Sequence, residues 1–142
     1  MRYLIILAAI GFMSFTLKTD ELNTCNGFEK FTFGKPKESF KNLTLEIEEG
    51  ISQLYNVNTK EVNMPGVEFE YIRISFINNK LSTIAFLTKN ATRGQFLKFL
   101  KDNYGTPAKT NRSYEWVGKK VKIIYEPYKN SHDAAIDFYS RR

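Results

Sequence analysis

The fold of this chain of 142 residues is decided by residues 67–80, VEFEYIRISFINNK. Apolar and polar residues alternate here, as in a β-strand that buries one face. The phase of the alternation slips once, because Val67, Phe69 and Tyr71 form the first apolar set and Ile72, Ile74 and Phe76 form the second. A slip of one residue indicates a β-bulge or a strand that changes the face it buries.

A tight turn is predicted after this strand, at Asn78-Asn79-Lys80, because Asn tolerates a positive φ. Residues 81–88 are therefore predicted to pair back as the second arm of a hairpin. Three more strands are predicted nearer the C-terminus, at 114–117, 119–126 and 134–139. The alternation in the last two strands places Val121, Ile123 and Tyr125 on one face, and Ala134, Ile136 and Phe138 opposite Asp137 and Tyr139.

A helix is predicted between the hairpin and these strands. Thr92-Arg93-Gly94-Gln95 has the pattern of a capping box, in which the Thr92 hydroxyl accepts from the Gln95 backbone and the Gln95 amide reaches back. Gly105 is a suitable C-cap, and Pro107 cannot continue the helix. The expected buried side is formed by Phe96, Leu97, Leu100 and Tyr104.

Upstream of residue 67 the pattern is weaker. Residues 28–33 alternate like a strand, and Pro36 suits the first position of a short helix predicted over 36–43. Residues 43–55 stay ambiguous, because Leu43 and Ile47 fit both a helical and an alternating pattern. These elements predict the α+β class, an antiparallel sheet with helices packed on one face, in an order that allows two β-α-β-β(-β) units.

The N-terminus is predicted to be a secretory signal peptide over residues 1–16. Arg2 precedes an apolar run, Leu4 to Met13, that is shorter than the roughly 20 residues of a membrane span. Cleavage is expected after Thr16, within the range 16 to 20, and the protein is then expected in the periplasm or outside the cell. Residues 17–27 are predicted to be a flexible N-terminal segment, and 28–142 a single domain.

The chain contains one Cys and one His, which excludes an internal disulfide and most metal sites. Cys25 lacks the small preceding residues of a lipidation site, so a lipid anchor is not expected. His132 and Asp133 are adjacent in a polar loop and are interpreted as part of a turn rather than as a general base. Phosphate-binding, hydrolase and metalloprotease motifs are absent, so we expect no catalytic residue, no metal and no cofactor.

The charge is divided unevenly. Residues 17–70 contain 6 Lys and 10 Asp or Glu, whereas residues 71–142 contain 14 Lys or Arg and 5 Asp or Glu. A basic surface on an exported protein could contact an envelope or extracellular protein, or acidic glycans or lipid head groups. The alternative is that the two halves neutralise each other within one fold. Nucleic acid is not an expected partner, because no recognition motif is present.

The candidate partner-binding residues lie in the C-terminal strands, where aromatic and basic side chains occur together. Tyr, Trp and Arg are the residue types that anchor interfaces, although alternation directs half of them inward. These candidates are Arg112, Tyr114, Trp116, Lys120, Lys122 and Tyr139.

Short motifs in the chain resemble those of a group of small exported bacterial domains. They are the export signal, the run Phe31-Thr32-Phe33-Gly34-Lys35-Pro36, and a helix that closes in Tyr104-Gly105-Thr106-Pro107 before a Trp strand. The chain is similar in these to the outer-membrane assembly lipoprotein BamE and to the β-lactamase inhibitory protein. The resemblance implies a protein that binds a partner through an open sheet face or edge and has no enzymatic activity.

The resulting expectation is an exported, non-enzymatic binding or accessory module of the cell envelope. One alternative is a small hydrolase acting on envelope glycans, which would need two carboxyl groups with opposed pKa shifts in a concave pocket. Another is a secreted inhibitor of an extracellular enzyme. A third is a structural envelope protein that self-associates through Cys25 or a strand edge.

Overall fold

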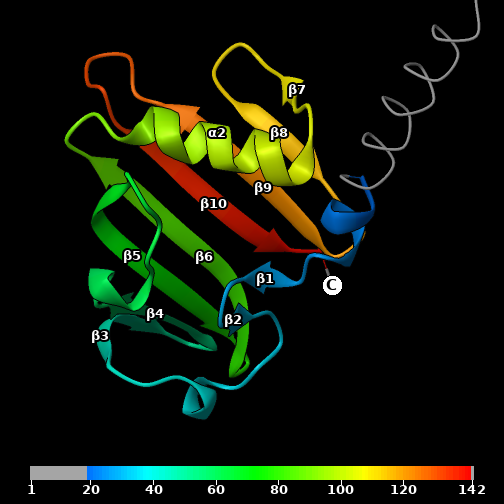
Figure 1. Ribbon diagram of the computed structural model, residues 1–142. Helices are drawn as coiled ribbons and strands as arrows, with labels where there is room; N and C mark the ends of the chain where they lie inside the picture. Colours follow the sequence, from blue (N-terminus) through cyan, green and yellow to red (C-terminus); the bar gives the residue numbers. More distant parts are fainter. Residues whose placement is uncertain (1–18, 142) are drawn as a thin grey trace, which may run out of the picture.

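The computed structural model describes residues 19–141, and most of that range forms one antiparallel sheet. Eight strands lie in the order β3-β4-β5-β6-β10-β9-β8-β7 (Figure 1). Their bounds are Leu43–Glu49 for β3, Ser52–Val57 for β4, Glu68–Ile77 for β5, Lys80–Lys89 for β6, Ala108–Lys109 for β7, Tyr114–Val117 for β8, Val121–Pro127 for β9 and Ala134–Ser140 for β10. The sheet therefore consists of two four-stranded meanders whose last strands, β6 and β10, pair with each other.

The α+β prediction is wrong, because the described part of the chain is mostly β. Helix α2, Arg93–Tyr104, is its one α-helix of seven or more residues. The predicted helix over 36–43 is a single 3-10 turn, η1, Lys37–Ser39. Asn42 has a φ of 58°, which ends any helical continuation, and from Leu43 the period-two pattern prevails as strand β3.

The described residues 19–141 therefore do not form the predicted β-α-β-β units. The strand predicted over 28–33 is a small hairpin of β1, Gly27–Phe28, and β2, Phe31–Thr32. Residues 43–55, ambiguous in sequence, lie in strands β3 and β4, which pair with a bulge between Leu45 and Ile47. A second 3-10 turn, η2, Thr59–Glu61, leads toward β5.

The hairpin predicted from residues 67–80 is confirmed. β5 and β6 pair antiparallel, and their register shifts between Phe69 and Tyr71, where the alternation slips. Asn78 and Asn79 have φ angles of 50° and 55°, as a tight hairpin turn requires. The predicted C-terminal strands are also present as β8, β9 and β10.

The core lies on one face of the sheet, beneath α2 and the β1–β2 hairpin (Figure 1). Phe28 of β1 contacts the rings of Phe86, Phe96 and Phe138, with centroid distances of 5.0, 6.2 and 5.2 Å. These four rings come from β1, β6, α2 and β10, so the same cluster joins both meanders and the helix. We call this covered side of the sheet the inner face.

Helix α2 occupies the predicted range, but its N-terminus is not a capping box. The Thr92 hydroxyl makes no hydrogen bond to the helix; it accepts from the backbone N–H of Glu68 at 2.9 Å and donates to the Lys89 carbonyl at 2.8 Å. It therefore holds the ends of β5 and β6. At the other end Gly105, with a φ of 82°, is the predicted C-cap.

The domain begins before the predicted residue 28. Residues 19–24 are helical, and Leu22 is buried in the core against the β8–β9 turn. The flexible segment predicted over 17–27 therefore does not describe residues 19–27. The predicted signal peptide and its cleavage position at Thr16 lie outside the described residues. Between residues 19 and 141, no helix is long and apolar enough to cross a bilayer.

Candidate binding surface

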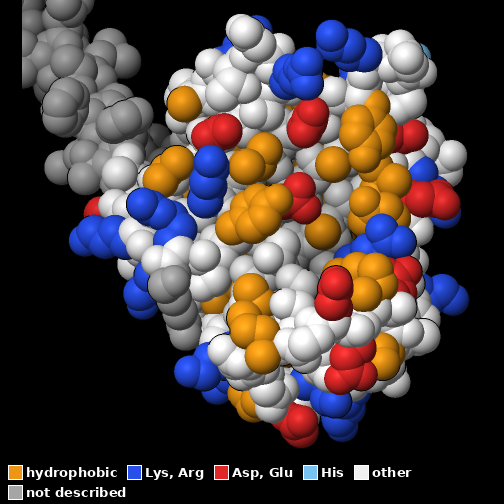
Figure 2. Space-filling view, turned by 180° about the vertical axis from the view of Figure 1, so that it is seen from behind, with side chains coloured by type: hydrophobic (Ala, Val, Ile, Leu, Met, Phe, Trp, Pro, Cys, Tyr) orange, Lys and Arg blue, Asp and Glu red, His pale blue; other side chains and the backbone are white. Residues whose placement is uncertain are grey.

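The face of the sheet opposite α2 has no covering element in the described structure. We call it the outer face, and Figure 2 shows it from behind, with hydrophobic side chains gathered in several groups among acidic and basic ones. Strand register assigns it Tyr71, Arg73 and Ser75 of β5, Thr83, Ala85 and Leu87 of β6, Ala135, Asp137 and Tyr139 of β10, Lys122, Ile124 and Glu126 of β9, and Glu115 and Val117 of β8.

Alternation along each strand produces this surface. In β10, Ala134, Ile136 and Phe138 are fully buried on the inner face. The residues between them are half-buried or exposed on the outer face, and Tyr139 is 38% exposed. The outer face is therefore a sheet surface of aliphatic, aromatic and paired charged side chains that is accessible to another molecule.

The structure divides the six predicted site residues between two faces and two turns. Trp116 is only 2% exposed, and its indole Nε1 donates to the Gly105 carbonyl at 2.9 Å beneath the end of α2. Tyr114 lies on the same inner face against Tyr125, with ring centroids 6.0 Å apart. Trp116 is thus a core residue and is not available to a partner.

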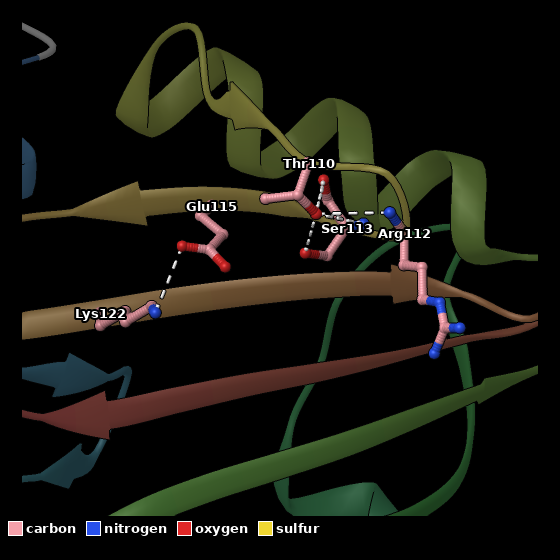
Figure 3. Close-up of polar contacts among 5 residues, drawn as sticks. All are labelled: Thr110, Arg112, Ser113, Glu115 and Lys122. Atoms are coloured by element: carbon pink, nitrogen blue, oxygen red, sulfur yellow. Dashed lines mark hydrogen bonds and ion pairs between the residues drawn. The ribbon is translucent and has the colours of Figure 1, made fainter.

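Lys122 and Tyr139 are brought together, because they are direct cross-strand neighbours on the outer face. Lys122 is not a free cation, since its Nζ lies 3.2 Å from a carboxylate oxygen of Glu115 on β8 (Figure 3). The alternation that predicted an outward Lys122 could not show this pair, because it depends on the β8–β9 register.

Arg112 and Lys120 lie in turns. The β7–β8 turn is held by the Thr110 hydroxyl, which accepts from the Ser113 backbone at 3.0 Å and from the Arg112 backbone at 3.3 Å. Figure 3 places the Arg112 side chain at the far end of β8 from the Lys122–Glu115 pair. Lys120 is exposed in the β8–β9 turn, where its carbonyl accepts from the Arg141 backbone. The six residues therefore do not form one site.

The centre of the outer face contains groups that were not among the candidates. Asp137 lies between Ile124 of β9 and Ala85 of β6. Burial raises the pKa of its carboxyl group, and the hydrogen bond from the Tyr139 hydroxyl opposes the shift. The signal in the sequence was an acidic residue between two apolar strand positions, but only the register shows that it is central.

Arg73 also lies on the outer face, and it forms an ion pair with Glu46. Its Nε lies 2.8 Å from a carboxylate oxygen of Glu46, and its guanidinium carbon lies 4.1 Å from the centre of the Tyr71 ring. Arg73 and Lys122 are thus each paired with a glutamate: Glu46 of β3, which lies across β4 from β5, and Glu115 of β8, which is adjacent to β9.

Residues for metal or thiol chemistry are not assembled. Among residues 19–141, no three His, Cys, Asp or Glu side chains are grouped so that they could hold a metal ion. Cys25 is half-buried beside Tyr104, with its Sγ 3.2 Å from the Gly27 carbonyl oxygen and 3.7 Å from the Tyr104 hydroxyl. Burial, together with this cysteine, raises the pKa of Tyr104.

No family model, no curated protein and no solved structure matches this chain. The resemblance to BamE and to the β-lactamase inhibitory protein rests on the motifs in the sequence and stays a prediction.

Proposed function

We propose that this protein is an exported, non-enzymatic binding module of the cell envelope, and that it binds another protein through the outer face of its sheet. The observation that carries the proposal is that face itself. It spans five strands, no described element covers it, and it presents Tyr139, Val117 and Tyr128, which are 38%, 52% and 42% exposed. Large exposed apolar surface of this kind is typical of interaction sites.

A protein suits this surface better than an anionic lipid or glycan does. Aromatic residues framed by paired charges are characteristic of protein–protein interfaces. Binding to phosphate or sulfate groups would instead need free cations. Arg73 and Lys122 are each held by a glutamate, so neither is a free cation for such a group.

Export is supported by the N-terminal charge followed by an apolar run, which is the order of a secretory signal. The test is mass spectrometry of the protein isolated from separated cell fractions. We expect a mature chain that begins after Thr16, or within the following four residues, in the envelope or the medium. Recovery of the uncleaved chain from the cytoplasm would contradict export.

The binding role is tested by obstructing the outer face. Thr83→Arg places a long side chain between Tyr139 of β10 and Ser75 of β5, on the open surface. The matched control is Gln95→Arg, on the exposed side of α2 in the opposite layer. Proteins crosslinked in the source cell to the native chain and to each variant are compared by quantitative mass spectrometry.

We expect at least one protein to be captured equally by the native chain and by Gln95→Arg, and to be lost with Thr83→Arg at an unchanged melting temperature. If Thr83→Arg lowers the melting temperature, Ser75→Arg on the neighbouring strand repeats the test. Capture that Thr83→Arg and Ser75→Arg leave unchanged would overturn the proposal. Hydrolysis of envelope glycans by the purified protein would replace it with the enzymatic alternative.

A further inference from the structure

The chemistry of the partner can be inferred from the centre of the outer face, an argument that rests on the proposed function. Three tyrosines and two carboxylates meet there, and we call them the tyrosine–carboxylate patch: Tyr71, Glu126, Tyr128, Asp137 and Tyr139. They come from β5, β9, β10 and the residue that follows β9.

Strand register brings the patch together. Asp137 of β10 lies opposite Ile124 of β9, and Glu126 of β9 lies opposite Ala135 of β10. The two carboxylates are therefore diagonal neighbours on the outer face of these paired strands. Tyr71 reaches the same region across β6, because it pairs with Leu87 and Leu87 pairs with Ala135. Burial, together with the nearby Tyr71, Glu126 and Asp137, raises the pKa of the Tyr128 phenol.

In the described part of the chain, the two carboxylates of the patch have no ion-pair partner. Between residues 19 and 141, no lysine or arginine forms an ion pair with Asp137 or Glu126. On the outer face, Arg73 and Lys122 are bound to Glu46 and Glu115. Arg112 and Lys129 line a pocket with Glu126 and Tyr128 but form no ion pair with Glu126. The acidic side chains of the patch thus belong to the C-terminal half of the chain, residues 71–142, which is otherwise rich in Lys and Arg.

Asp137 is also partly withdrawn from water. It is half-buried between the strands, and burial raises the pKa of its carboxyl group, so its charged form is poorly solvated. A carboxylate in this environment gains more from an added cation than an exposed one does. The rings of Tyr128 and Tyr139 remain 42% and 38% exposed, and tyrosine faces attract ammonium and guanidinium groups.

We propose that the tyrosine–carboxylate patch receives a cationic side chain of the partner protein, the guanidinium of an arginine or the ammonium of a lysine. The carboxylates of Asp137 and Glu126 neutralise it, and the rings of Tyr128 and Tyr139 pack against it. The partner is therefore a protein with an exposed basic residue in an apolar surround, which matches the aliphatic surface around the patch.

The probe for this proposal is a short peptide, acetyl-Gly-Arg-Gly-amide, titrated into the isotope-labelled chain and followed by NMR. We expect saturable amide shifts confined to residues 71, 124–128 and 135–139. The lysine analogue is expected to shift the same amides. The citrulline analogue, which has the same shape without the charge, and the glutamate analogue are expected to shift none of them.

Variants locate the binding group. Asp137→Asn is expected to weaken binding of the arginine peptide about tenfold, the loss of one charge-assisted hydrogen bond. Glu49→Gln, an exposed carboxylate at the β3–β4 turn, is the matched control and is expected to leave binding unchanged. Tyr128→Ala is expected to weaken binding, and Tyr128→Phe to restore it, because the ring and not the hydroxyl packs on the cation.

Equal shifts with the citrulline peptide, shifts centred elsewhere, or no saturable shifts would overturn the proposal. Its failure is distinguishable from that of the proposed function, because Thr83→Arg tests the outer face without changing a residue of the patch. Loss of capture by Thr83→Arg together with no response to the arginine peptide would mean that the outer face binds a partner by other contacts.

Discussion

The sequence predicts both Trp116 and Tyr139 as partner-binding residues, but the structure places them on opposite faces of the sheet. Both are large aromatic residues in C-terminal strands, two or three positions before a basic residue, Lys119 or Arg141. The Trp116 indole is buried and donates to the Gly105 carbonyl, whereas the Tyr139 ring is on the open face and its hydroxyl binds Asp137. Residue type predicts that a side chain can anchor an interface, but the face of the sheet decides whether it does.

Asp137 is expected to make stability depend on pH. Burial raises the pKa of its carboxyl group in the folded protein above 3.8, its ordinary value. Below pH 3.8 both states are protonated and the carboxyl costs nothing. The cost develops as pH rises through the raised pKa and is complete at neutral pH. Asp137→Asn should therefore stabilise the protein at pH 7 more than at pH 3.

Urea unfolding of both chains at the two pH values measures this difference. Glu49→Gln, at an exposed position, is the control and should give the same small change in the free energy of unfolding at each pH. An equal effect of Asp137→Asn at pH 3 and pH 7 would contradict the expected desolvation of the carboxylate.

Ala91 is held in a backbone conformation that suits glycine, with a φ of 59° before α2. A left-handed conformation costs an L-residue roughly 1–2 kcal/mol, and the added unfolded-state freedom of glycine costs about 0.4–1 kcal/mol. Ala91→Gly should therefore raise the free energy of unfolding by about 0.5–1 kcal/mol, as measured by chemical denaturation.

Gly50 provides the reverse change under matched conditions. Its φ is 58°, and a Cβ atom there would meet nothing within 4 Å. Gly50→Ala should therefore destabilise the protein through the backbone alone, by an amount similar to the gain at Ala91. Two changes of the same sign would show that these φ angles do not determine the effect.

At the level of elements, one strand-forming segment also fits a helical pattern. Residues 43–47 form the edge strand β3 because the alternating positions pair with β4, and Leu45 lies opposite Tyr55.

Helix α2 is tied to the sheet at its start, where the Arg93 guanidinium donates to the carbonyls of Tyr128, Ser131 and Asp133 at 3.1, 2.9 and 3.3 Å. The β9–β10 loop, which leads from Tyr128 to β10, is thereby held at the start of α2.

The helical turn over residues 19–24 depends on Gly118. A Cβ atom at this position would lie 2.4 Å from the Leu22 carbonyl oxygen, a backbone atom that cannot move without the whole turn. Gly118→Ala should displace residues 19–24 and leave the sheet folded. Hydrogen exchange should show faster exchange for amides 22–25 and unchanged exchange in β9 and β10.

Gly94→Ala is the control for this change, because a Cβ atom there meets nothing within 4 Å. If Gly118→Ala leaves amides 22–25 as protected as before, residues 19–24 do not pack on the β8–β9 turn in solution.

In the whole molecule, one aromatic cluster joins the two meanders. Phe86 of β6 contacts Phe28, Phe69, Phe96 and Phe138, with centroid distances of 5.0, 5.4, 5.4 and 6.0 Å. The β6–β10 pairing beneath it unites residues about fifty positions apart in the chain. We therefore expect the sheet to unfold as one unit rather than as two four-stranded halves.

Phe86→Leu tests this cooperativity. The smaller side chain should lower the free energy of unfolding by about 1–3 kcal/mol, and the loss should be the same for amides in β4 and in β9 by native-state hydrogen exchange. A loss confined to β4 and β5 would mean that the two meanders open independently.

Much of the strand pattern was predictable. The β5–β6 hairpin with its bulge, the range of α2, and the buried sides of β9 and β10 follow from local alternation and turn residues, because these are encoded by neighbours in the chain. The helix predicted over 36–43 is wrong beyond the turn Lys37–Ser39, because Asn42 has a positive φ and Leu43 already pairs in β3. The capping box is wrong because the Thr92 hydroxyl accepts from the Glu68 backbone instead.

The sequence by itself determined which segments alternate, where the chain turns, and that Cys and His chemistry is nearly absent. Only the tertiary structure decided the pairing of β6 with β10, the burial of Trp116, and the meeting of Asp137 with Tyr128 and Tyr139. Alternation assigns side chains to two faces of a strand but does not say which strands are neighbours or which face the helix covers. Those choices depend on burying the aromatic residues of both meanders in one core.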